Sequence, residues 1–206
     1  MDELNEFRTE YGDIAETIEE FYEVMDISEE QKEERKKLAN ELFNVFLFLF
    51  ALMELSKDNG YVDLDYISLE FELRFAPIVK SYARDDEYIN LYISKVINDV
   101  VDTTYRHEDE EYFLSDNRAL GLALNESNSV LNYEELAEAV ESGYTHKIWV
   151  AELDKKTRDD HRMMNGKVVA IDDYFVFDDC QMLFAHDEVN GSPRQTVNCR
   201  CATKYT

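Results

Sequence analysis

The spacing of apolar side chains changes once along this sequence, at Gly143, and that change constrains the fold most strongly. Before Gly143, apolar residues recur three and four positions apart beside acidic ones, which is the pattern of amphipathic helices. After it, the segments KIWVAEL and MNGKVVAI contain short extended runs bounded by turn residues. The sequence therefore predicts an α+β protein, with a mainly helical N-terminal part followed by a small α+β C-terminal domain with short strands.

A long helix is expected between Ser28 and Asn59-Gly60. The Ser28 hydroxyl can cap the first free amides of such a helix, and an Asn-Gly pair is a common helix end. The helix contains the most apolar run of the chain, Leu42–Leu55, which is interrupted by Asn44 and Glu54. Because this run is shorter than the roughly 20 residues that cross a bilayer, we interpret it as a buried helix and expect no membrane partner.

Further helices are expected up to Gly143. The helical pattern continues from residue 61 to 105, where Pro77 either starts a new helix or kinks one. Ser115 or Asp116 is a good cap for a helix through roughly Asn132, and a short helix over Tyr133–Glu141 follows. The chain is thus divided into an acidic helical region, connecting helices and a C-terminal domain, over residues 1–117, 118–145 and 146–206.

The formal net charge of −25 is concentrated in the first part of the chain. Residues 1–145 carry 12 basic and 36 acidic side chains, a net charge of −24, whereas residues 146–206 carry 9 basic and 10 acidic ones. A segment this acidic repels phosphate groups and cannot release counterions from nucleic acid. We therefore expect no direct binding of duplex DNA by the N-terminal part, and we expect its partners to be proteins.

A series of motif residues in fixed order marks the region from Gly143 to Cys201. They are Lys147-Ile148-Trp149, Asp154, Thr157-Arg158, His161, Asn165-Gly166, Asp172-Asp173, Phe175, Asp187, Gly191-Ser192-Pro193 and Asn198-Cys199-Arg200-Cys201. This order resembles the C-terminal domain of phage Mu F-like minor head proteins, over about residues 118–206. Glu126 resembles the glutamate on the helix that precedes this domain in the family. Where the family often has a Tyr-Pro-Gly-Asp turn, this chain has Phe184-Ala185-His186-Asp187.

The resemblance implies a non-enzymatic minor head protein that assists procapsid assembly or acts at the portal vertex. Its implied partners are phage portal, capsid or scaffold proteins, and its implied location is the virion, with the host cytoplasm during assembly. The alternative is a metal-dependent hydrolase or toxin-like effector, because similar domains are attached to phage-borne toxins. No Gly-rich phosphate loop, H-E-x-x-H helix or paired catalytic carboxylate motif favours that alternative.

Two cysteines and a histidine form a candidate zinc site. Cys199, Cys201 and His161 offer two thiolates and one imidazole, which zinc accepts in tetrahedral sites. Cys180 or His186 would have to provide the fourth ligand. Buried free thiols, and a disulfide formed after virion release, are the alternatives to zinc.

The C-terminal motif is expected to close the domain. Trp149 should be buried in the strand that enters the domain, and Asn198–Cys201 should be held as a strand beside it, which would bring both cysteines near His161.

A polar clamp is the second expectation for this domain. Asp154 or Thr157 could cap a helix that carries Arg158 and His161 and ends at Asn165-Gly166. Arg158 is expected to pair with Asp154 and Asp187 as this clamp. Without zinc, Arg158 or Arg200 paired with Asp154 or Asp187 would hold the closure.

Overall fold

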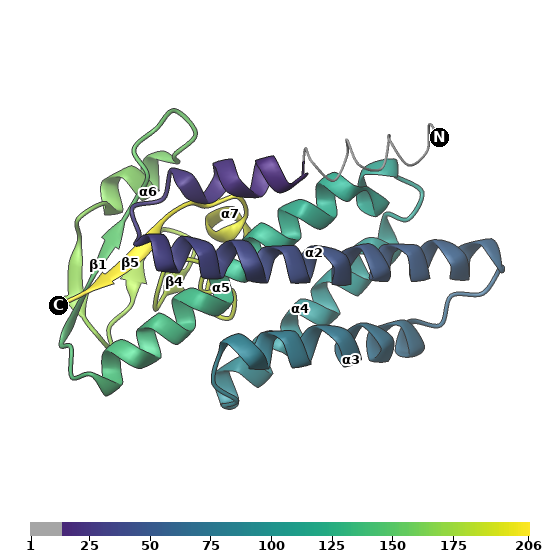
Figure 1. Cartoon of the computed structure of the whole chain (residues 1–206), viewed down its shortest axis with the longest axis horizontal. Coiled ribbons are helices and arrows are strands. Elements are labelled where there is room, and N and C mark those ends of the chain that lie inside the picture. Colours follow the sequence, from purple (N-terminus) through teal and green to yellow (C-terminus); the bar gives the residue numbers. More distant parts are fainter. Residues whose placement is uncertain (1–13) are drawn as a thin grey trace.

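The computed structural model describes residues 14–206 and has the predicted α+β architecture, with helices first and short antiparallel strands gathered at one end (Figure 1). Residues 14–23 form a helix that lies alongside α2. The longer helices are α2 (Glu29–Asp58), α3 (Leu64–Tyr82), α4 (Glu87–Arg106) and α5 (Asp116–Glu141), and η1 (Glu111–Leu114) is a short 3-10 turn. The C-terminal elements are β1 (His146–Val150), α6 (Asp159–Met164), β2 (Val168–Ala170), β3 (Phe175–Val176), β4 (Gln181–Met182), α7 (Pro193–Thr196) and β5 (Ala202–Tyr205).

Helix α2 begins and ends where its local signals predict. The Ser28 hydroxyl accepts a hydrogen bond from the Gln31 backbone, and the Gln31 side chain accepts one from the Ser28 backbone, which forms a capping box. Asn59 caps the C-terminal end, and Gly60 follows in a left-handed conformation with φ 75°.

The apolar run of α2 supplies the centre of the helical core. Phe46 lies fully buried against Phe71 and Phe75 of α3, with ring centroids 5.7 and 6.0 Å apart. By length and composition α2 is the one described helix that could cross a membrane, and half of its most apolar stretch is buried inside the protein. Helix α3 continues through Pro77, so this proline does not start a new helix.

Helix α5 is continuous, which corrects the prediction of two helices meeting at Asn132 and Tyr133. Asparagine favours helix ends because its side chain competes for backbone hydrogen bonds. Here the Asn132 side chain instead accepts from Arg35 of α2 at 2.8 Å and donates to the Ala185 carbonyl at 2.7 Å. These tertiary contacts remove the competition, and the helix passes through.

The main sheet has the order β2-β1-β5, and both pairings are antiparallel. Trp149 pairs with Thr203 across β1 and β5, while β3 and β4 form a separate two-stranded sheet. The closing strand begins at Ala202, four residues after the start predicted at Asn198. Asn198 adopts φ 56°, and this left-handed turn delays the extended conformation.

Candidate metal centre

His161, Cys199 and Cys201 meet in the interior of the C-terminal domain. Their ligating atoms all lie within 4.8 Å of one another, and no side chain of the three is more than 2% exposed. His161 Nδ1 is 3.3 Å from Cys201 Sγ and 3.5 Å from Cys199 Sγ. The predicted convergence of the His161 helix with the two cysteines is confirmed, and this cluster could hold a metal ion.

Two structural elements bring these residues together. Helix α6 carries His161 and ends at Asn165 and Gly166, as predicted, and Gly166 adopts φ 79°, which glycine tolerates best. The antiparallel pairing of β1 with β5 places the cysteines, which directly precede β5, beside the buried Trp149. The burial expected for Trp149 is confirmed.

The hydrogen bonds of His161 orient its ring for ligation. Gln195 donates its side-chain amide to Asp160 and Asp179, so its oxygen is left to accept from His161 Nε2 at 2.8 Å. The proton therefore resides on Nε2, and the Nδ1 lone pair faces the two sulfurs. Metal-binding histidines typically donate their second ring nitrogen in this way. Gln195 was not identified as a site residue from the sequence, because no local signal marks it as a partner of His161.

The two thiols have opposite electrostatic properties. Burial alone would raise the pKa of Cys199, but the hydrogen bond with Cys201, the nearby His186 imidazole and the hydrogen bond with His161 hold it well below its usual range. The hydrogen bond to Cys199, and then burial, raise the pKa of Cys201 well above its usual range. Burial alone would lower the pKa of His161, but Cys199 raises it. The surroundings of Cys199 thus favour its thiolate form beside an imidazole, and a thiolate is the form that binds a cation.

The space beside the cluster is very small. The cavity lined by His161, Cys199 and Cys201 measures about 10 Å³. A water molecule requires roughly 10–15 Å³, so this cavity fits a single atom or ion but no organic substrate.

The predicted arginine clamp forms with a different arginine. Arg200, and not Arg158, pairs with Asp154 at 2.8 Å and holds the pKa of that carboxyl well below its usual range. Arg158 donates to the Val197 carbonyl at 2.5 Å. Asp187 accepts from the Tyr88 hydroxyl at 2.8 Å and pairs with neither arginine among the described residues. The closure by Arg200 and Asp154 is one of the pairs that the sequence predicted.

Two further motif residues have backbone roles. The cap expected from Asp154 or Thr157 is wrong, because α6 begins at Asp159, and its N-cap residue Arg158 makes no side-chain capping bond. Asp154 instead accepts from the Lys156 backbone at 2.8 Å and fixes the preceding turn. Asn198 donates its backbone N–H to the Asn125 side chain on α5 at 3.0 Å, which anchors the final motif on the helical part.

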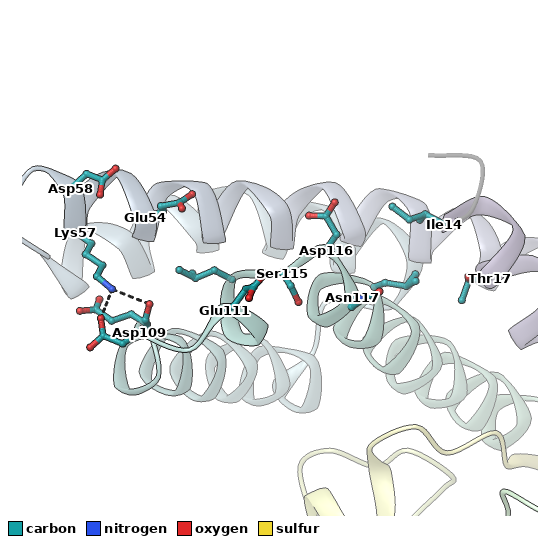
Figure 2. Close-up of a pocket in the computed structure, with 13 residues that line it drawn as sticks. Ile14, Thr17, Glu54, Lys57, Asp58, Asp109, Glu111, Ser115, Asp116 and Asn117 are labelled. Carbon is teal, nitrogen blue, oxygen red and sulfur yellow. Dashed lines mark hydrogen bonds and ion pairs between the residues drawn. The ribbon is translucent and has the colours of Figure 1, made fainter. Parts of the chain in front are cut away.

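A second, larger hollow lies between the end of α2, η1 and the start of α5 (Figure 2). It measures about 790 Å³. Six carboxylates line it, from Glu54, Asp58, Glu108, Asp109, Glu111 and Asp116. Its lining contains a single lysine, Lys57, which bonds Asp109 at 2.5 Å and the Glu108 carbonyl at 3.0 Å. This groove suits a cationic surface and not a phosphate group.

Comparison with known proteins assigns a family to this arrangement. Residues 93–204, more than half of the chain, match the family described as Phage Mu protein F like protein. The chain belongs to this Mu F-like family. The match starts within α4, upstream of the resemblance read from the motifs, and includes all three residues of the cluster. No curated protein and no solved structure matches the chain. Membership of the Mu F-like family suggests a phage head morphogenesis protein associated with the virion.

Proposed function

We propose that this Mu F-like protein is a non-enzymatic minor head protein that assists procapsid assembly at the portal vertex. The family match over residues 93–204 carries this proposal. Its partners are phage portal, capsid or scaffold proteins, which it meets in the host cytoplasm before it is incorporated into the virion. The net charge of −24 over residues 1–145 supports protein partners over duplex DNA and gives no reason to expect a membrane partner.

The C-terminal domain binds zinc as a structural ion in this proposal. Two cysteines and a histidine are borderline-soft donors that zinc prefers, and a closed site is typical of structural zinc. All three cysteines of the chain are free thiols, so Cys199 and Cys201 are available as ligands. A domain of this size has little apolar area, and metal binding can supply folding free energy.

The alternative of a metal-dependent hydrolase or toxin-like effector has less support. A catalytic zinc keeps one position open to water and substrate. The cavity of about 10 Å³ at the cluster offers no such access, and the thiols are 2% exposed. A nucleophilic cysteine would also need an exposed approach path for its substrate.

Quantitative mass spectrometry of purified procapsids and virions tests the head role. We expect the chain in both particles at a low copy number relative to the major capsid protein, and co-purification of the full chain with portal protein. A chain that is absent from procapsids and virions, while free in the lysate, would contradict the proposal. Portal, scaffold or capsid genes beside the gene for this chain would add support.

A further inference from the structure

His186 is a buried histidine without a hydrogen-bond partner. Its side chain is fully buried, and neither ring nitrogen has a partner among the described residues. A buried polar group without a partner loses its bonds to water and gains nothing in return, so such groups are rare in folded proteins. An unpartnered buried imidazole therefore indicates that something else binds it.

The backbone holds His186 firmly at this place. The residue before it, Ala185, donates its N–H to Thr203 of β5 at 3.0 Å, and the Ala185 carbonyl accepts from Asn132 of α5 at 2.7 Å. His186 itself adopts φ 65°, a left-handed conformation that is uncommon for any residue other than glycine. A strained backbone that neighbouring elements hold in place often marks a functional position.

The His186 imidazole lies between the metal cluster and a buried carboxyl. On one side the residue before it, Ala185, packs in the same buried cluster as Cys199 and Cys201, and the His186 imidazole favours the thiolate form of Cys199. On the other side its charge acts on the Glu188 carboxyl, which also accepts from Asn125 of α5 at 3.2 Å. An imidazole between a thiolate and a carboxylate has the arrangement of a metal-binding histidine whose second nitrogen donates to an acid.

We propose that His186 is the fourth ligand of the zinc site, which completes a Cys2His2 set with His161, Cys199 and Cys201. The inference rests on the zinc binding proposed above and adds the residue that three ligands leave undetermined. In the bound state both cysteines are thiolates and both imidazoles are neutral. His161 donates its second nitrogen to Gln195, and His186 would donate its second nitrogen to Glu188 once its ring has turned toward the ion.

Ligation requires a modest movement. His186 is outside the group whose ligating atoms lie within 4.8 Å of one another, so its ring turns toward the other three when the ion binds. Four ligands around a tetrahedral zinc lie roughly 2.0–2.3 Å from the ion. The cavity of about 10 Å³ already provides room for the ion itself.

Cys180 is the competing fourth ligand, and its position argues against it. Its side chain is partly exposed and already has hydrogen bonds with Ser192, whereas the His186 imidazole is fully buried without a partner in the described residues. It is therefore the matched control, because it is a zinc-binding residue type in the same domain that the proposal leaves without a role.

Cobalt(II) titration of the full chain tests the ligand set, because tetrahedral cobalt with thiolate ligands gives intense visible bands. We expect one equivalent to bind the wild type. His186→Asn, which tolerates a left-handed backbone, should weaken binding by more than the roughly 10–100-fold that loss of an outer-shell partner costs. Glu188→Gln should weaken it by about that factor, and Cys180→Ser should leave the affinity and bands unchanged.

The outcomes separate the two proposals. A wild type that binds no cobalt and no zinc would overturn the zinc site itself. A wild type that binds, with His186→Asn equal to it in affinity and bands, would overturn only the fourth ligand, and so would loss of binding in Cys180→Ser. If His186→Asn fails to fold, NMR of the wild-type chain tests the same ligand without a substitution. On zinc addition, nitrogen NMR should show shifted ring signals for both His161 and His186, and a shift of His161 alone would overturn the assignment.

Discussion

At the residue scale, Trp149 is the side chain around which the C-terminal core packs. Its ring centroid lies 5.2, 5.3 and 5.5 Å from those of Phe175, Phe177 and His161, all in edge-on contacts. Replacing Trp149 with Ala should lower the free energy of unfolding by roughly 3–5 kcal/mol, because the cavity left cannot be refilled. Urea denaturation measures this value. Tyr174→Ala, at a side chain that is 39% exposed in the same domain, should change it by only about 0.5 kcal/mol, and an equal loss in both variants would contradict the role of Trp149.

Glu126 should make stability fall as pH rises. Burial, and then the nearby Glu188 carboxyl, raise the pKa of Glu126 to about 8. Tyr92 donates to its carboxyl at 2.6 Å and Lys95 attracts it, which oppose the shift, while Asp99 adds to it. The folded state therefore keeps a proton that the unfolded chain releases near pH 4.3. The stabilisation is complete below that pH and is lost as the pH rises toward 8.

The variant Glu126→Gln isolates this effect, because it stays neutral and still accepts from Tyr92. Its melting temperature relative to the wild type should increase from pH 5 to pH 8, by the equivalent of on the order of 3 kcal/mol. Glu72→Gln, at an exposed position on α3, is the control and should show no such trend. A constant difference between Glu126→Gln and the wild type across this pH range would show that Glu126 is ionised throughout.

At the level of elements, a buried arginine joins α2 to α5. Arg35 is fully buried and forms an ion pair with Glu135 at 2.8 Å. It also donates to Asn128 and Asn132 at 3.2 and 2.8 Å. Arg35→Ala would remove the cation that pairs with Glu135 and would take this donor from the buried side-chain oxygens of Asn128 and Asn132, so it should cost about 3–5 kcal/mol. Thermal melts of both variants measure these costs. Arg106→Ala breaks an exposed ion pair on α4 and should cost less than about 1 kcal/mol. Similar losses in the two variants would contradict the role of Arg35 in joining α2 to α5.

The same helix pair shows which element boundaries a sequence can predict. The start of α2 depends on Ser28 and Gln31, which lie in one helical turn, and the local pattern predicted it correctly. The continuity of α5 depends on Arg35 and Ala185, which lie far away in sequence, so the local pattern predicted a break at Asn132. Local capping is thus visible in a sequence, whereas contacts that override propensity are not.

On the scale of the whole molecule, the order of the motifs predicted that His161 would meet Cys199 and Cys201, because a closing strand must return beside β1. The partners of the charged groups were harder to predict. Arg158 and Arg200 are equally plausible partners for Asp154 in sequence, and only the path of the turn after β1 selects Arg200.

The last ten residues, 197–206, should hold the C-terminal domain together. They contain β5 and both cysteines of the metal cluster, and β5 supplies one of the two partners of β1. Deleting them removes the closure that Arg200 and Asp154 provide and opens the core around Trp149. The helical part loses Ala202 from its core, the hydrogen bond from Asn198 to Asn125 of α5 and the exposed pair of Lys204 with Asp26, while the packing of α2 against α3 stays intact. Hydrogen exchange should therefore accelerate across residues 146–196 and stay slow in α2 and α4.

The control is Lys204→Ala, which removes only the exposed pair and should exchange like the full chain. Native protection of residues 146–196 in the shortened chain would refute this closure.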